Sequence, residues 1–312
     1  MNISTAQLFH RAYGRFAIGA FNIFTMEQVL GLFKGADKAA APIIVAITPV
    51  ARRYAHPHML AAMINAASDM YPDVVFSVHL DHGDPDHCVD AISSGVYNSV
   101  MIDASFETFD KNIAITSEIV RRAHNIGVQV EAELGVLGGI EDTINVDEDK
   151  ELYTDPQQAE EFVSKTQCDS LAVAVGTSHG AYKFSSGHGL RLDVLCKIGE
   201  RMPSFPLVLH GASAVPHDEI ERINAAGGSL KRSAQGTDPV ELKQAIKYGV
   251  CKINIATDAR LIWTRVHREF FHDQPGQFDP ILPGQQYIVD YAEFVAAKCR
   301  ILDSNDKAGL FK

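Results

Sequence analysis

The sequence lacks the features that mark disulfide-stabilised, nucleic-acid-binding and membrane-spanning proteins. Its five cysteines form no CxxC pair and are scattered through the chain, which indicates free thiols in a reducing compartment. The formal net charge of -11 argues against nucleic acid or a membrane surface as a partner. No apolar segment approaches about 18 residues, and residues 1–5 lead directly into an amphipathic stretch, so we expect a cytoplasmic protein.

What the sequence does have is a regular alternation of short apolar runs with helical periodicity. A chain of 312 residues with 46% hydrophobic content can bury a sizeable core. Eight apolar runs are predicted as strands: Ile18–Asn22, Pro42–Ala46, Val74–Leu80, Ser99–Ile102, Val128–Ala132, Ser170–Val175, Pro206–Leu209 and Cys251–Ile255.

The alternation predicts an α/β fold of one domain spanning residues 1–312. Near-continuous apolar strands separated by helices indicate a parallel sheet covered by helices. A count of eight favours a closed (β/α)8 TIM barrel over the alternative, an open doubly wound sheet. Longer inserts are expected at the carboxyl ends of strands, where barrel enzymes carry their chemistry: Gly135–Pro156, Ser178–Gly189, around Gly227–Pro239, and Gln274–Gln286.

Three histidines follow the ends of three different predicted strands, and each precedes a glycine. They are His82, His179 and His210. In a closed barrel these ends converge, so three imidazoles can meet around one zinc ion at about 2.0–2.1 Å and leave a fourth position open for substrate. One such histidine alone would more often be a capping residue, but three together favour a catalytic metal site. His79 has the opposite parity to His82 and is interpreted as a packed barrel residue.

Carboxylates gather at the same end of the predicted barrel. Asp81 precedes His82, Asp103 follows the fourth strand, and Glu131 and Glu133 lie in and just beyond the fifth. Acidic groups in apolar strands are costly unless they are paired or bind a metal. For Glu131 an ion pair and a functional role remain equally open. Asp81 is predicted to transfer a proton beside the metal.

Three glycine-rich or small-residue segments follow the last three predicted strands. They are Gly176–Lys183, Gly211–Ser213 and Asn254–Thr257. Barrels commonly bind phosphate at this position through backbone N–H groups and a hydroxyl, and Lys183 can add a positive charge.

With these residues in these positions, the chain resembles a known family, the class II fructose/tagatose-bisphosphate aldolases. The matching segments span nearly the whole chain in order: Gly19-Ala20-Phe21-Asn22, Leu80-Asp81-His82-Gly83, Ser99 to Ser105, Val130 to Gly135 running on to Gly138 to Asp142, Gly176 to Phe184, Pro206 to Ser213, and Lys252-Ile253-Asn254.

The resemblance implies an aldehyde-lyase of carbohydrate metabolism, including glycolysis. Such an enzyme reversibly cleaves a ketose phosphate of the fructose or tagatose 1,6-bisphosphate type to dihydroxyacetone phosphate and an aldehyde, glyceraldehyde 3-phosphate or an analogue. Zinc is then the electron sink, so no Schiff-base lysine is required. A monovalent cation, Na⁺ or K⁺, often accompanies the phosphate in the family, and a homodimer or homotetramer is implied.

The resemblance also assigns residues. It implies His82, His179 and His210 as zinc ligands, and it places Asp103 and Glu133 near a mobile or second metal position. Asp81 becomes the acid/base at the C4 hydroxyl, and Glu141 assists proton exchange from a loop. Substrate-binding positions follow: Thr48, Gly180, Lys183, Gly211, Ala212, Ser213, Asn254, Ile255, Ala256, Thr257 and Arg260.

The sequence departs from the family pattern at the end that would meet the aldehyde. Ala256 stands where fructose-bisphosphate enzymes tend to carry Asp, and Thr48-Pro49 is similar to the tagatose-type pattern. Ile281 replaces an arginine that commonly reaches the distal phosphate in the partner subunit. An enzyme for a ketose 1-phosphate that lacks the distal phosphate is therefore an alternative. Distal charge can still come from Arg52, Arg53 and Arg260.

Two other classes of function compete with the aldolase. A metal-dependent barrel hydrolase would use the same histidines and carboxylates to activate water, but it gives no reason for the phosphate-binding segments. A typical metallohydrolase HxH pair at a strand end is also absent, since His56-Pro57-His58 lies outside the predicted strands. A noncatalytic phosphosugar-binding protein would not require Asp81 together with all three candidate ligands.

Overall fold

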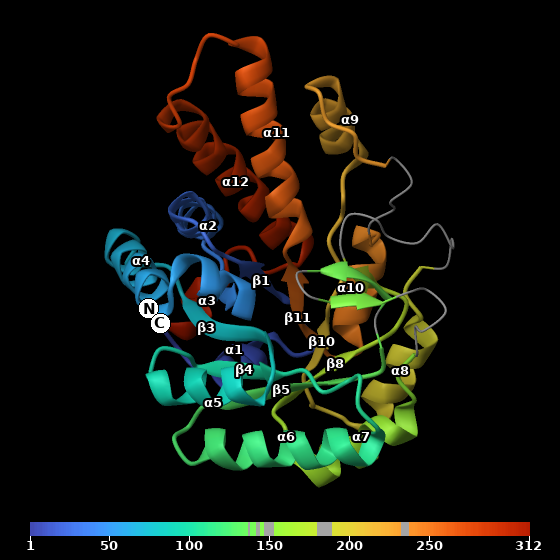
Figure 1. Cartoon of the computed structure of the whole chain (residues 1–312). Helices are drawn as coiled ribbons and strands as arrows, with labels where there is room; N and C mark the ends of the chain where they lie inside the picture. The colour runs from blue at the N-terminus through green and yellow to red at the C-terminus, as the bar shows by residue number, and fades with distance from the viewer. Residues whose placement is uncertain (137, 142–143, 147–152, 180–188, 232–236) are drawn as a thin grey trace.

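The fold is built around a closed barrel of eight parallel strands (Figure 1). The computed structural model describes residues 1–312 except 137, 142–143, 147–152, 180–188 and 232–236, and the side chains of 138–141, 144–146 and 178–179 also lie outside the description. Neighbouring strands follow the order β1-β11-β10-β8-β5-β4-β3-β2, and the predicted (β/α)8 barrel is thus confirmed. The strands are β1 (Ile18–Asn22), β2 (Ile43–Ile47), β3 (Phe76–Gly83), β4 (Ser99–Ile102), β5 (Gln129–Leu134), β8 (Ser170–Val173), β10 (Leu207–Leu209) and β11 (Val250–Ile255).

The strands are apolar on both faces because each face packs against a different layer. Ile44 and Ala46 of β2 belong to a cluster that includes Leu8 and Phe9 of helix α1 (Thr5–Ala12). Val45, of opposite parity, belongs to the larger cluster shared with the surrounding helices. This two-sided burial explains why the strands read as continuous apolar runs instead of alternating ones.

Several of the helices begin where the sequence supplies a side-chain cap. Thr25 forms a capping box with Gln28 at the start of α2, and Asp84 and Asp155 cap helices that have proline in the first turn. The remaining helices are α2 (Met26–Ala39), α3 (Pro49–Ala55), α4 (Pro57–Met70), α5 (Pro85–Ser94), α6 (Phe109–His124), α7 (Pro156–Thr166), α8 (Leu192–Arg201), α9 (His217–Ala225), α10 (Pro239–Lys247), α11 (Thr257–Asp273), α12 (Ile281–Ile301) and the 3-10 helix η2 (Ala308–Phe311).

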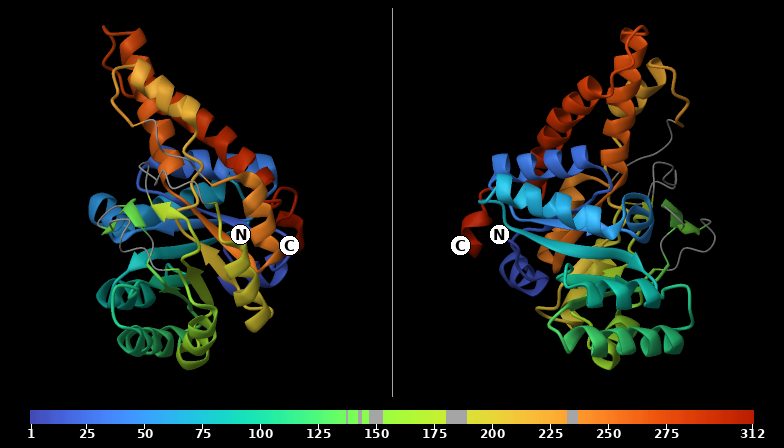
Figure 2. Two further views of the ribbon diagram at one scale, coloured as in Figure 1. Left: turned by 90° about the vertical axis from the view of Figure 1, so that its right-hand side faces the viewer. Right: turned by 60° about the vertical axis from the view of Figure 1, so that its left-hand side comes forward.

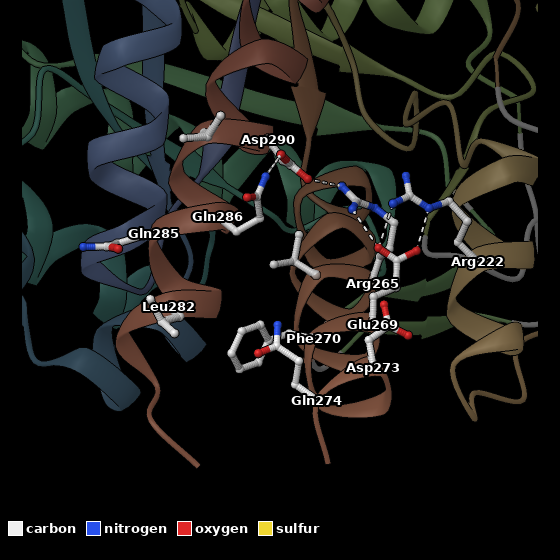
Figure 3. Close-up of a pocket in the computed structure, with 12 residues that line it drawn as sticks. Arg222, Arg265, Glu269, Phe270, Asp273, Gln274, Leu282, Gln285, Gln286 and Asp290 are labelled. Atoms are coloured by element: carbon white, nitrogen blue, oxygen red, sulfur yellow. Dashed lines mark hydrogen bonds and ion pairs between the residues drawn. The ribbon is translucent and has the colours of Figure 1, made fainter. Parts of the chain in front are cut away.

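Helices α11 and α12 extend beyond the barrel as an arm, with α9 beside α11 (Figures 1 and 2). Buried Arg265 ties the arm together, because its guanidinium lies 2.6 Å from Glu219 of α9 and 2.7 Å from Asp290 of α12. Arg222 of α9 also pairs with Glu269 of α11 at 2.6 Å (Figure 3). The arm is therefore held by a charged network where its three helices meet.

Two of the predicted inserts do not lie directly at strand ends. Residues 227–239 lie between α9 and α10, and Gln274–Gln286 connects α11 to α12 and includes the first turn of α12, so both follow helices. The insert after β5 contains β6 (Gly138–Glu141) and β7 (Ile144–Val146), which form a three-stranded sheet with β9 (Ser178–His179). The sequence predicts a long insert from its loop-forming residues, but these do not show whether the insert follows a strand or a helix.

All five cysteines are free, as the sequence predicted. Among the described residues, no helix is both long enough and apolar enough to cross a bilayer.

Candidate metal centre

The centre begins at the end of β3, where Asp81 and His82 are adjacent in sequence. Neighbouring residues of a regular strand point to opposite faces, so only one of them should face the mouth of the barrel. His82 instead has φ +48°, a left-handed conformation that is uncommon for a residue with a side chain. The pairing of β3 with β4 shifts register between Leu80 and Gly83 at the same place. This local irregularity brings the His82 ring back to the side of Asp81.

Two of the predicted histidine ligands point at one another across the barrel. His82 Nε2 lies 2.9 Å from His210 Nδ1, and the rings meet edge to face with centroids 4.6 Å apart. His210 follows β10 and is fully buried. The two nitrogens therefore face one shared position, as ligands of a common ion do.

A carboxylate binds the opposite nitrogen of each ring. Asp103 Oδ2 lies 2.9 Å from His82 Nδ1, and Glu131 Oε1 lies 2.8 Å from His210 Nε2. Such partners accept the ring N–H and so fix the tautomer of a metal-binding histidine. With both outer nitrogens bonded to carboxylates, the two inner nitrogens share one position, which a proton or a metal ion can occupy.

The electrostatics of the pair explain the short contact between the two rings. Burial acts to lower the pKa of His82, yet the charge of Asp81 and the hydrogen bond to Asp103 outweigh it and raise the pKa to about 10. Burial lowers the pKa of His210 to about 4. His82 is therefore the protonated ring, whose Nε2–H donates to His210 Nδ1, and a divalent ion bound here would displace that shared proton.

A buried lysine completes the support behind His210. Lys252 Nζ lies 2.7 and 2.9 Å from the two oxygens of Glu131 and 3.1 Å from His79 Nε2, and both Lys252 and Glu131 are buried. Burial would raise the pKa of Glu131, but the positive charge of Lys252 holds it below the ordinary value. Glu131 is therefore both an ion-pair partner and the orienting partner of His210. His79 is a packed barrel residue, as predicted, and also bonds Ser99 Oγ at 2.7 Å.

Glu133 supplies an independent sign that a cation belongs here. Its side chain is buried, and Oε2 has no hydrogen-bond partner among the described residues. Burial and the nearby charge of Asp103 raise its pKa well above the ordinary value. The ligand atoms of Asp81, His82 and His210 lie within 4.8 Å of one another, as do those of His82, Asp103 and Glu133. Nitrogen and carboxylate donors gathered in this way fit a divalent ion such as Zn²⁺.

Asp81 is held in a fixed orientation beside this cluster. Asn22 Nδ2 donates to one carboxylate oxygen at 2.7 Å, and Asn254 Nδ2 donates to the other at 2.9 Å. Burial would raise the pKa of Asp81, but the charges of His82, His210 and Lys252 hold it below its ordinary value. Its two amide donors come from β1 and β11, on the opposite side from Asp103 and Glu133.

The described phosphate-binding candidates lie in two segments, the loop after β10 and the start of α11, and Asp258 connects the two. Gly211 has φ +63°, and Ala212 and Ser213 that follow it are buried. Thr257 begins α11, immediately after β11. Asp258 next to it accepts hydrogen bonds from the backbone N–H groups of residues 214 and 215, at 3.0 and 2.8 Å. The loop after β10 and the start of α11 are thereby fixed against one another. Ile255, which ends β11, and Ala256, which precedes α11, are also predicted substrate-binding residues, and both are buried.

Four predicted residues cannot be placed fully. The side chains of His179 in β9 and Glu141 in β6 lie outside the described residues, as do Gly180 and Lys183 entirely. Backbone pairing does place β9 beside β6, so the two predicted loops meet. The roles of His179 in binding metal, of Glu141 in proton exchange, and of Gly180 and Lys183 in binding substrate remain predictions.

The candidate distal cations are dispersed. Buried Arg52 pairs with Asp90 and lies 5.6 Å from the ring centre of Tyr97, while Arg53 is exposed. Arg260, in the first turn of α11, lies over the ring of Phe24 at 5.8 Å. Ile281 is the first residue of α12 and is 60% exposed. The helix begins at the end of the arm away from the barrel (Figure 1).

Three residues with clear roles in the structure have no role predicted from the sequence: Asn22, Lys252 and Asp258. For Glu131 the sequence left an ion pair and a functional role equally open, and the structure shows the ion pair together with the bond to His210. A signal existed for Lys252, because a lysine inside an apolar strand must be paired, the same argument that singled out Glu131. Asn22 was quoted in a motif without a role. Nothing local distinguishes Asp258 from other helix-start acids.

Together the barrel and the cluster at its strand ends define a (β/α)8 protein with a histidine- and carboxylate-lined metal site. The model of the family described as fructose-bisphosphate aldolase class-II matches residues 3–307. The chain belongs to this family, and it is a class II aldolase, a carbon–carbon lyase.

Individual relatives agree with the family match. A fructose-bisphosphate aldolase of Giardia intestinalis is 40% identical over 302 residues, which cover 96% of this chain and 91% of that protein. A class 2 fructose-bisphosphate aldolase of Synechocystis is 40% identical over 292 residues, covering 87% and 81%. Among solved structures, the YdjI aldolase of Escherichia coli K12 superposes with a TM-score of 0.78 at 27% identity, covering 99% of this chain and all of that one. The relationship favours the aldolase over the hydrolase and the noncatalytic binding protein.

Proposed function

We propose that this aldolase reversibly cleaves a ketose phosphate to dihydroxyacetone phosphate and an aldehyde, with Zn²⁺ held by His82 Nε2, His210 Nδ1 and His179. The observation that carries the proposal is the pair of imidazole nitrogens 2.9 Å apart, each ring fixed from behind by a buried carboxylate. Asp103 and Glu133 would serve a second position of the ion. A bound divalent ion supplies Lewis-acid stabilisation of the negative charge that develops beside a carbonyl.

The protein's own groups would move the protons. In cleavage, Asp81 accepts the proton of the C4 hydroxyl and the C3–C4 bond breaks. C4 becomes the aldehyde carbonyl, and the electron pair of the broken C3–C4 bond stays on C3. Asn22 and Asn254 keep the acceptor oxygens aimed, since each occupies one oxygen of Asp81. Glu141, on the segment after β5, is proposed to return a proton to C3.

The dihydroxyacetone phosphate end is proposed to bind where the loop after β10 meets α11. Gly211, Ala212 and Ser213 offer backbone N–H groups, and Thr257 lies at a helix start, where anions are favoured. Gly180 and Lys183 are proposed as further partners, with Asn254, Ile255 and Ala256 beside the reacting carbons. A monovalent cation, Na⁺ or K⁺, is proposed beside the phosphate.

The assembly is proposed to be a homodimer or homotetramer in the cytoplasm. Phe278, Ile281 and Leu282 at the far end of the arm are 91%, 60% and 48% exposed, which supports association through apolar contacts. The free thiols support a reducing compartment. Light scattering coupled to gel filtration should give two or four times the 34.1 kDa chain mass, and a monomer at micromolar concentration would contradict the assembly.

Metal removal tests the central proposal. The purified enzyme is dialysed against dipicolinate, and dihydroxyacetone phosphate release from fructose and tagatose bisphosphates is followed with a coupled dehydrogenase. We expect activity to fall to background and to return with one equivalent of Zn²⁺, while borohydride, which traps lysine imines, has no effect. Full activity in metal-free protein would overturn the proposal.

A further inference from the structure

A pocket of about 320 Å³ opens at the barrel mouth over the ends of β1 and β2. Its lining includes Phe24, Thr48, Val50, Tyr54, Arg260 and Trp263. This volume suits a small organic molecule. None of these walls belongs to the cluster of histidines and carboxylates.

The pocket lies on the side of the centre where Asp81 acts. Asn22, which donates to Asp81, ends β1, and Phe24 follows it by two residues. Asn254, the second donor, belongs to β11, and Arg260 lies in the first turn of the helix that follows. Strands β2, β1 and β11 are neighbours in the barrel. Since Asp81 takes its proton from the hydroxyl that becomes the aldehyde, the aldehyde half extends toward this pocket.

The walls of the pocket are mostly apolar and aromatic. The rings of Phe24 and Tyr54 meet edge to face with centroids 6.5 Å apart. The Arg260 guanidinium lies over the Phe24 ring, 5.8 Å from its centroid. The Thr48 hydroxyl accepts the N–H of Ala51 at 3.2 Å. Within the described part of the chain, Arg260 is the only charged residue that lines the pocket.

A phosphate dianion needs more than such a pocket offers. Phosphate sites combine several charge-assisted donors, usually arginine forks or rows of backbone N–H groups. Two further arginines lie between the lining residues Ala51 and Tyr54, but neither lines the pocket. Arg52 is buried against Asp90 and the His87 carbonyl with its guanidinium over Tyr97, and Arg53 is exposed. One guanidinium stacked on an aromatic ring, with aromatic and aliphatic walls around it, fits hydroxyl and C–H groups better.

We propose that this pocket holds the aldehyde half of the substrate and selects an uncharged aldehyde, so that the preferred substrates are ketose 1-phosphates without a distal phosphate. The inference rests on the proposed aldolase function and adds to it the chemical class of the second product. Phe24, Tyr54 and Trp263 provide the contact surface, and Arg260 and Thr48 provide hydrogen bonds to hydroxyl groups.

The test is run in the direction of condensation, with the zinc-loaded enzyme and saturating dihydroxyacetone phosphate. Initial rates are measured with glyceraldehyde 3-phosphate, glyceraldehyde and butanal as acceptors. We expect kcat/KM for glyceraldehyde to equal or exceed that for its phosphate. A preference for glyceraldehyde 3-phosphate of about a hundredfold or more would overturn the inference while leaving the aldolase proposal intact. No condensation with any acceptor would overturn both.

Variants of Tyr54 test whether this pocket selects the aldehyde. The Tyr54 side chain is 73% exposed, so its replacement should leave the fold intact. Tyr54→Ala should lower kcat/KM for glyceraldehyde and butanal about tenfold with the KM of dihydroxyacetone phosphate unchanged. Tyr54→Arg should shift the ratio of the two glyceraldehydes about tenfold toward the phosphate. Met59→Ala, an exposed change on neighbouring α4, is the control and should alter no ratio. Equal effects of the Tyr54 variants on every acceptor would refute the assignment of this pocket.

Discussion

Removing the Lys252 charge tests the buried network behind His210 most directly. Lys252→Met keeps the volume of the side chain but leaves the Glu131 carboxylate, which is 2% exposed, without its cation. Loss of one partner of a buried ion pair costs about 3–5 kcal/mol of unfolding free energy, because an uncompensated charge remains in the interior. Since Glu131 also orients His210, zinc affinity should fall about 10- to 100-fold.

The double variant separates charge from packing. Glu131→Gln keeps an acceptor for His210 and removes the buried charge, so Lys252→Met/Glu131→Gln should recover at least half of the lost stability. Guanidinium unfolding of the zinc-free proteins gives both free energies. Lys243→Met is the matched control, because its pair with Asp303 is about half exposed on both sides and should be worth at most about 1 kcal/mol. Equal stability of Lys252→Met and Lys243→Met would refute a costly buried charge at Glu131. So would a double variant in which Glu131→Gln lowers the stability further instead of restoring it.

Two further substitutions test the proton carrier and the phosphate loop. Asp81→Asn should lower kcat by about 10²- to 10⁴-fold while zinc content, measured by plasma mass spectrometry, is unchanged; a kcat within about tenfold of the parent would rule out the assigned role. Asp258→Ala removes the acceptor of two backbone N–H groups and leaves buried Lys298 unpaired, so it should cost about 3–5 kcal/mol and raise the KM of dihydroxyacetone phosphate more than it lowers kcat. An unchanged KM in steady-state assays would show that Asp258 does not fix the phosphate-binding loop.

The barrel could be predicted from sequence because its strands carry a strong local signal. Ile18–Asn22 and Ser99–Ile102 were predicted with the observed bounds, and the other strands were displaced by at most a few residues at either end. Both faces of each strand are covered, so apolar runs coincide with strands. The arm formed by α11 and α12 carries no such signal, because its shape depends on packing between helices and on the charges around Arg265.

The site was harder to predict, since its contacts join residues that are distant in the chain. Glu131 and Lys252 are separated by 121 positions, and neither sequence neighbourhood reveals the other. Asp103 shows a different limit: the sequence placed it near the metal, but only geometry shows that it bonds His82 Nδ1, the nitrogen that faces away from His210. Residue type predicts what a group can do, whereas its partner determines which role it has.

The turn at the end of β3 links the two halves of the proposed chemistry. In a regular strand only one of Asp81 and His82 would point toward the barrel mouth, but the left-handed conformation of His82 directs both side chains there. Such a conformation costs about 1–3 kcal/mol and persists only where surrounding contacts enforce it. The packing around Gly83 is tight enough to hold this conformation, because a Cβ added at Gly83 would lie 2.6 Å from the Leu80 side chain and 3.0 Å from the Met101 carbonyl oxygen. The base and a metal-facing imidazole are thereby fixed one residue apart, so a change in packing beneath this turn would displace both together.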